Sequence, residues 1–212
     1  QWDNRTIHII GLNIDSKNKL MVEKCKKLKE MRKERAEKIS LKLSKVGIEG
    51  AYEYTKKIAI NGNITRYHFA QFLIENKHAK NLTDVFKHFL VKNKPGYVSA
   101  NWPNLDETIN LINAAGGVAV IAHPLRYKIT ATKLRKLIKE FKNCGGKAIE
   151  VITSHNILKE VAIATDYAKK YNLAASIGSD FHNQKTSWSK LGELPLLPDN
   201  LLPVWNLWQD NN

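Results

Sequence analysis

The sequence predicts an α/β protein in which a parallel sheet, or a β/α barrel, is interrupted by a helical insertion. Three observations predict this class. From residue 105 onward, apolar β-branched segments alternate with amphipathic segments, as repeated αβ units do. The apolar segments are nearly continuous, which is typical of strands covered on both faces. A long Lys-rich stretch with helical periodicity separates these units from one earlier strand, so we expect the helical residues to be inserted in the α/β fold.

That earlier strand is expected over residues 7–14, where IHIIGLNI is apolar and β-branched and leads into the polar Asp15. The chain starts without Met, and polar QWDNRT runs directly into the strand. Because a natural N-terminus is usually a looser segment, we expect further sequence upstream.

The insertion is expected over residues 16–102, which leaves residues 1–15 and 103–212 as the α/β part. Its first element is a long basic helix from Lys17 to about Val46. The apolar stripe of this helix comprises Met21, Cys25, Leu28, Ala36, Ile39, Leu43 and Val46. Its basic face suits either solvent or a nucleic acid.

Two shorter helices should follow within the insertion. Thr65 is a candidate N-cap for a helix over residues 67–75, and Thr83 precedes another short helix. Lys94-Pro95-Gly96 then ends the helical pattern.

The remaining residues alternate between helix and strand. A helix through Leu111 ends at Gly116-Gly117, and two more helices are expected over residues 132–142 and 157–170. The strands between and after them are VAVIA, AIEVI and LAASIG. This order implies a parallel sheet, open or closed.

Composition limits the classes of partner and compartment. The chain has 34 Lys and Arg against 20 Asp and Glu, and its formal charge of +14 favours polyanions such as nucleotides, RNA or acidic membranes. Cys25 and Cys144 lack C-x-x-C spacing, so neither a disulfide framework nor a cysteine zinc site is predicted. No window approaches the roughly 20 apolar residues of a membrane span. We expect a soluble protein of the reducing cytoplasm.

Histidine and aspartate side chains occur where predicted strands end. His8 lies in the first strand and His123 follows VAVIA. Asp180 and His182 follow LAASIG, and residues two apart in an extended segment face the same side. The carboxyl ends of parallel strands form the active face of such folds, so these groups can converge on a metal. Neutral imidazole and carboxylate suit Mn, Fe or Zn.

A packing role is the alternative for each histidine. His123 alone, before Pro124, suits either role. Packing explains Asp180-Phe181-His182 less well, because small residues lead into it and a structural turn seldom needs both an acid and an imidazole.

Four segments, IHIIGLNID, NITRYHFAQFL, GGVAVIAHPLRY and ASIGSDFH, resemble the PHP (polymerase and histidinol phosphatase) family. Within it the chain is most similar to a bacterial group with a helical insertion, which includes 3',5'-nucleoside bisphosphate phosphatases and the 5'-to-3' exoribonuclease RNase AM. The resemblance covers nearly the whole chain. T-R-x-H-F is specific to this branch, whereas A-H-P and G-S-D-F-H mark the wider family.

The resemblance implies a distorted (β/α)7 barrel that holds a cluster of two or three divalent metals. Mn is the first choice, with Fe, Zn or Mg as alternatives. His8, His123, Asp180 and His182 would be ligands, and the last three would serve catalysis through metal-activated water. The family's opening H-x-H segment and further acidic ligands have no counterpart here, so about half of the ligand set is expected upstream of Gln1.

A phosphoester substrate also needs cationic donors. Arg66 lies near a helix N-terminus, an unusual place for a purely structural cation, and Arg126 follows the His123 loop. Lys94 is a weaker candidate because lysines are abundant in this chain. Further candidate phosphate or substrate contacts are His68, Ser154 and His155. For these three a helix-face or capping role is the alternative, and Glu150 suits either a supporting carboxylate or a structural pair.

We therefore expect a phosphoesterase that hydrolyses nucleotide monoesters such as 3',5'-bisphosphates, with RNA 5' ends as a further substrate and the basic insertion covering the site. Two other classes stay open. One is a non-catalytic basic nucleic-acid-binding module with a degenerate barrel, and the other is a different metal-dependent barrel hydrolase, such as an amidohydrolase or histidinol phosphatase. The first hypothesis requires upstream ligands, whereas the nucleic-acid-binding module does not. No protein partner is predicted.

Overall fold

The computed structural model describes residues 1–59, 62–154, 157–181 and 191–208. The chain divides into two compact units. The α/β unit contains residues 1–21 and 102–212, and the helical unit contains residues 22–101.

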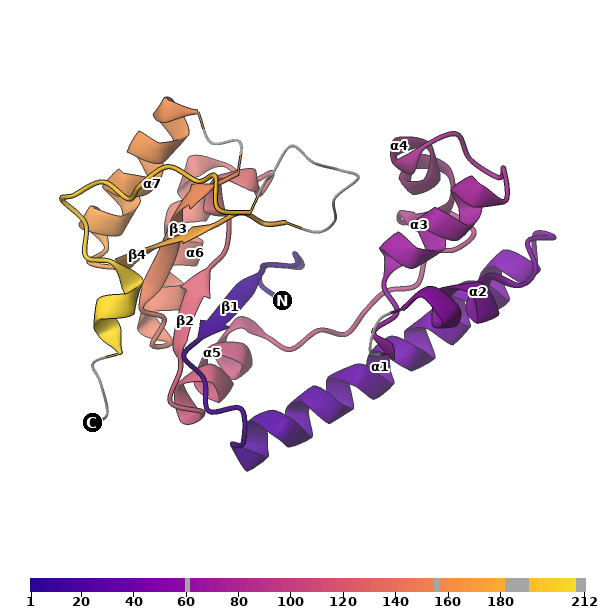
Figure 1. The fold of residues 1–212 in the computed structure, drawn as a ribbon, viewed down its shortest axis with the longest axis horizontal. Coiled ribbons are helices and arrows are strands. Elements are labelled where there is room, and N and C mark those ends of the chain that lie inside the picture. Colours follow the sequence, from indigo (N-terminus) through magenta and orange to yellow (C-terminus); the bar gives the residue numbers. More distant parts are fainter. Residues whose placement is uncertain (60–61, 155–156, 182–190, 209–212) are drawn as a thin grey trace. The chain divides into compact units, whose positions relative to one another are not determined.

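Four strands of the α/β unit form one sheet in the order β1-β2-β3-β4 (Figure 1). They are β1 (Ile9–Leu12), β2 (Val118–Ile121), β3 (Ala148–Thr153) and β4 (Ala174–Gly178). The last three are parallel, as predicted. β1 is antiparallel to β2, with Ile9 opposite Ile121, and His8 lies just before it. The expectation of a parallel first strand is wrong because pairing, which the apolar pattern does not encode, sets strand direction.

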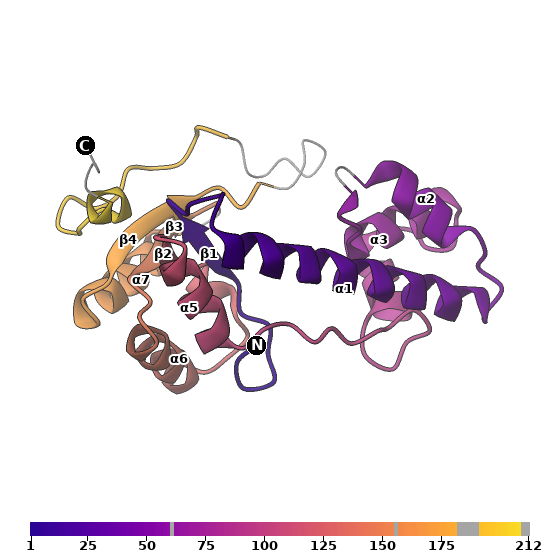
Figure 2. The same cartoon turned by 90° about the horizontal axis from the view of Figure 1, so that it is seen from below.

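Three helices cover one face of this sheet (Figure 2). They are α5 (Leu105–Ala114), α6 (Ala131–Asn143) and α7 (Leu158–Lys170), and their predicted positions are confirmed to within a residue or two. Alternate sheet residues, including Ala119, Ile149 and Ala175, pack in the same core as the apolar faces of these helices. Fully buried Phe141 on α6 belongs to this core.

The opposite face of the sheet is packed by other residues. Val118, Val120, Ala148 and Ala174 form a second cluster with Val204. Val204 begins a short 3₁₀ helix (Val204–Leu207) near the C-terminus, which Figure 2 shows on the side of the sheet away from α5 and α6. The two faces of the sheet are thus packed by different elements.

The helical unit has its own core. Its elements are most of α1 (Lys19–Ser44), then α2 (Ala51–Ile58), α3 (Arg66–Glu75), α4 (Leu82–Val85) and a π-helical turn (Phe86–Leu90). The largest fully buried side chains of this core are Leu43, Phe69, Leu73, Val85 and Leu90. Three residues of the apolar stripe predicted for α1 pack in this core, namely Ala36, Ile39 and Leu43.

The predicted starts of the short helices need one correction. Thr65 precedes α3, as expected, and Thr83 lies inside α4 rather than before it. The side chain of Asn81 caps α4 by accepting the backbone N–H of Asp84 at 3.0 Å. Asn is as good an N-cap as Thr, so the cap moves two residues upstream. None of the described helices is both long and apolar enough to cross a membrane.

Candidate active site

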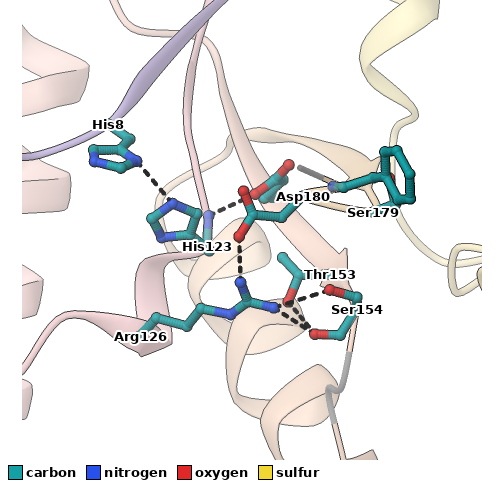
Figure 3. Close-up of polar contacts among 9 residues, drawn as sticks. His8, His123, Arg126, Thr153, Ser154, Ser179 and Asp180 are labelled. Carbon is teal, nitrogen blue, oxygen red and sulfur yellow. Dashed lines mark hydrogen bonds and ion pairs between the residues drawn. The ribbon is translucent and has the colours of Figure 1, made fainter. Parts of the chain in front are cut away.

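The candidate site of the α/β unit lies at the edge of the sheet where β2, β3 and β4 end. Figure 3 shows His8, His123, Arg126, Ser154 and Asp180 gathered there. His8 reaches this edge because β1 is antiparallel to β2. The backbone N–H of Ala122 donates to the carbonyl of His8 at 3.1 Å, which places His8 beside the residue before His123. His8, His123 and Asp180 therefore lie at one edge of the sheet, as expected, although β1 runs antiparallel to the other strands.

His8 and His123 face each other through ring nitrogens. His123 Nε2 lies 3.1 Å from His8 Nδ1, and the ring planes are close to perpendicular. Burial lowers the pKa of His123, and the charge of a protonated His8 lowers it further. A neutral imidazole is therefore favoured at His123, and this is the form that binds metals.

Tyr127 supports His8 and was not assigned a role from the sequence. Its hydroxyl accepts the backbone N–H of His8 at 2.8 Å, and its ring lies 5.3 Å from that of His123. Burial raises the pKa of Tyr127, so the phenol stays neutral. The only sequence signal was its position four residues after His123, in the segment HPLRY.

Arg126 connects two of the loops at this edge. Its Nη1 donates to Asp180 Oδ2 at 2.5 Å, and its Nη2 donates to the backbone oxygen of Ser154 at 2.5 Å and to Ser154 Oγ at 3.2 Å. These contacts use at most three of the five N–H groups of a guanidinium. Arg126 is thus fixed in place and still has donors for an anion.

Glu150 lies below His123 on the central strand β3. Its side chain is buried, and its Oε2 accepts the backbone N–H of His123 at 2.6 Å. Burial raises the pKa of Glu150, while the hydrogen bond from His123 opposes that rise. Of the two roles that the sequence left open for Glu150, the structure shows a contact with the backbone of His123.

A pocket of about 110 Å³ opens beside these residues. It is lined by His123, Pro124, Leu125, Arg126, Glu150, Thr153, Ser154, Glu160 and Ala164. The pocket combines an imidazole, a guanidinium and hydroxyls with the carboxyl groups of Glu150 and Glu160.

The imidazoles and the carboxylate at this edge could supply some of the ligands of a divalent metal. In the described part of the chain, no three His, Cys, Asp or Glu side chains form a metal-binding group. Asp180 is paired with Arg126, and His182 lies outside the described residues. The Nδ1 atom of His123 is nevertheless buried with no hydrogen-bond partner among the described residues. Two imidazoles and a carboxylate are chemically suited to Mn, Fe or Zn, so these residues fit such a group as part of a larger ligand set.

Arg66, His68 and Lys94 belong to the helical unit. Arg66 is exposed at the first position of α3, with its guanidinium 5.7 Å from the ring centroid of Phe86. His68 Nδ1 accepts the backbone N–H of Thr65 at 3.1 Å, and burial lowers the pKa of His68. The sequence had suggested a helix-face role as the alternative for His68, and it did not predict this capping contact. Lys94 is exposed after the π-helical turn, and His155 lies outside the described residues.

Two named relatives align with almost the whole chain. The 5'-3' exoribonuclease Rnm of Escherichia coli is 40% identical over 208 residues, which cover 98% of this chain and 71% of the relative. The 3',5'-nucleoside bisphosphate phosphatase of Chromobacterium violaceum is 36% identical over 205 residues, which cover 96% of this chain and 72% of the relative. A scan against models of known protein families finds no match.

Two solved structures share the fold. An amidohydrolase from Chromobacterium violaceum, solved with bound sulfate and no metal, aligns with a TM-score of 0.88 at 35% identity, covering 98% of this chain and 72% of that chain. A candidate metal-dependent phosphoesterase from Bifidobacterium adolescentis aligns with a TM-score of 0.76 at 20% identity over 96% of this chain and 70% of that chain.

The fold, the polar centre and these relatives define a phosphoric ester hydrolase of mixed α/β architecture. The chain belongs to the family that includes the 5'-3' exoribonuclease Rnm and the 3',5'-nucleoside bisphosphate phosphatase.

Proposed function

We propose that this chain carries part of the active site of a metal-dependent PHP phosphoesterase that hydrolyses phosphate monoesters of nucleotides. The observation that carries the proposal is the grouping of His8, His123 and Asp180 with Arg126 at one edge of the sheet. Imidazoles and carboxylates are metal donors, and a guanidinium binds phosphate through paired N–H groups. The first substrate class is a 3',5'-bisphosphate nucleotide, and the second is an RNA 5' end. The names of the two relatives support these classes.

Each residue at this edge has a defined part in the proposal. His8, His123 and Asp180 would hold the divalent ions, with His182 as a further ligand. Bound ions, with Mn as our first choice, would acidify a water and neutralise phosphate charge. The lowered pKa of His123 leaves its imidazole available as a ligand at neutral pH. Tyr127 fixes His8 through the backbone, which limits the positions that the His8 ring can take.

Arg126 is the proposed phosphate donor of the α/β unit. Its contacts with Asp180 and Ser154 hold the guanidinium in one orientation before substrate binds. Arg66, His68, Lys94 and His155 stay proposed substrate contacts. For Arg66, the Phe86 ring beneath the guanidinium supports a defined position for the charge.

We further propose that the four-stranded sheet belongs to a distorted PHP barrel with residues 16–102 as a helical insertion. The different packing of the two sheet faces supports a barrel, because α5, α6 and α7 cover one face while a separate apolar cluster lies on the other. A cytoplasmic location is part of the same proposal.

Phosphate release by the full-length protein tests the proposed activity. We expect Mn-dependent release of phosphate from a 3',5'-bisphosphate nucleotide. Asp180→Asn and His123→Ala should each reduce kcat by about 100-fold, since the first replaces an anionic donor with a neutral amide and the second removes an imidazole. Asp166→Asn, at an exposed position of α7, is the matched control and should keep wild-type turnover. Full activity in Asp180→Asn would exclude this site.

A comparison of substrates separates the two substrate classes. The values of kcat/KM for a 3',5'-bisphosphate and for a 5'-phosphorylated RNA oligonucleotide should be measured on the same preparation. The substrate with the higher value identifies the preferred class. Binding of the RNA without cleavage of either substrate would instead support the non-catalytic nucleic-acid-binding module.

A further inference from the structure

Strand β3 contributes a carboxylate that contacts the loop after β2 and the end of β4. Glu150 lies on β3, between β2 and β4, and pairs with Ser176 in the β4 register. Its Oε2 accepts the N–H of His123, in the loop after β2. Its Oε1 lies against Gly178, the last residue of β4 and two residues before Asp180. The buried Glu150 side chain therefore contacts the backbone at His123 and the backbone two residues before Asp180.

The backbone has an unusual conformation at both candidate donors, and Glu150 contacts one of them, His123, directly. His123 has φ 31° and ψ 58°, in the left-handed region, and Asp180 has φ 52°. Residues other than glycine adopt this region at a conformational cost and keep it only where the surroundings fix it. The Glu150 carboxylate supplies such a constraint at His123, because its hydrogen bond is directed at the N–H of that residue.

Gly178 provides the space for the carboxylate. A Cβ atom at position 178 would overlap Glu150 Oε1, well inside van der Waals contact. Moving the buried carboxylate away from such an atom would disturb its hydrogen bond to the N–H of His123. Alanine at position 178 must therefore displace either the carboxylate or the strand.

We propose that Glu150 is a positioning residue that fixes the His123 loop, and that Gly178 is required so that its carboxylate can reach that loop. The role in metal binding rests on the proposed function, whereas the Glu150–Gly178 contact does not. Glu150 acts here as a hydrogen-bond acceptor. Gln at this position keeps an acceptor oxygen of the same reach, and Ala removes it.

A double-mutant cycle on stability tests the geometry without any substrate. In urea unfolding of the full-length protein, Gly178→Ala should lower the midpoint clearly in the wild-type background. It should have little effect in the Glu150→Ala background, because the overlapping oxygen is gone. Gly11→Ala in β1 is the control glycine, since its Cβ would meet only side-chain atoms of Ile112 and Ile14. Equal shifts for Gly178→Ala in both backgrounds would overturn the proposal.

Metal binding and kinetics test the positioning role. Glu150→Ala should weaken Mn²⁺ affinity in equilibrium dialysis, or lower kcat with KM little changed, by about 10- to 100-fold. Glu150→Gln should restore most of the loss. A Gln variant as defective as the Ala variant would overturn the acceptor role and indicate a carboxylate that binds the metal directly. If the wild-type protein neither binds Mn²⁺ nor releases phosphate, the proposed function fails, while the stability cycle still decides the Glu150–Gly178 contact.

Discussion

Replacing Tyr127 with Phe removes one hydroxyl group and keeps the ring. That hydroxyl accepts the backbone N–H of His8 at 2.8 Å, and its contact with the His8 carbonyl, at 3.4 Å, is long for a hydrogen bond between oxygens. The ring should keep its packing on His123. The expected loss is that of a single hydrogen bond. Because His8 is exposed and water can reach it, we expect the free energy of unfolding to fall by about 1 kcal/mol.

Urea unfolding followed by circular dichroism measures this loss. With an m-value of about 2 kcal/mol/M, the midpoint should fall by about 0.5 M. Tyr171→Phe is the matched control, since Tyr171 is a partly buried tyrosine of the same unit whose hydroxyl bonds to no described residue. The argument would be refuted if Tyr127→Phe moved the midpoint no further than the control. A loss above about 3 kcal/mol would also refute it, because one hydrogen bond does not account for that much.

Three further predictions concern pH, packing and phosphate binding. Burial lowers the pKa of His68 in the folded state, so the unfolded state takes up a proton at higher pH and stability should fall as the pH drops below about 6.5. His68→Asn keeps an acceptor near Thr65 and should flatten this part of a stability curve measured by urea unfolding at several pH values. Phe141→Ala removes a fully buried ring of the α/β core and should cost about 3–5 kcal/mol in the same assay, whereas unchanged stability would mean that this core is not packed as described. Arg126→Lys keeps the charge and loses the planar guanidinium, so we expect KM for a bisphosphate to rise by about tenfold with Mn²⁺ binding unchanged. Arg135→Lys on α6 is its control, and equal KM values for the two variants would remove Arg126 from the phosphate contact.

The elements of the α/β unit could be predicted from the sequence because their signals are local. The alternation of apolar strands with amphipathic helices gave β2, β3, β4 and the three helices almost to the residue. The direction of β1 could not be predicted in this way. An apolar run of four to eight residues reads the same in either direction, and only its pairing partner decides.

The same distinction applies to the site. His8, His123 and Asp180 were candidates because polar residues at strand ends are visible in the sequence, and Arg126 because it follows a candidate ligand. Tyr127 could not be assigned, since its hydrogen bond joins residues 119 positions apart. The use of His68 as a capping acceptor also depends on geometry, because the capping pattern normally has Glu or Gln at that position.

The left-handed backbone at His123 and Asp180 sets stability against activity at two specific residues. Glycine would adopt both conformations without steric strain and would remove both donors. A protein selected only for thermal resistance would therefore be expected to lose these side chains early, while one selected for turnover has to keep a costly backbone in both loops.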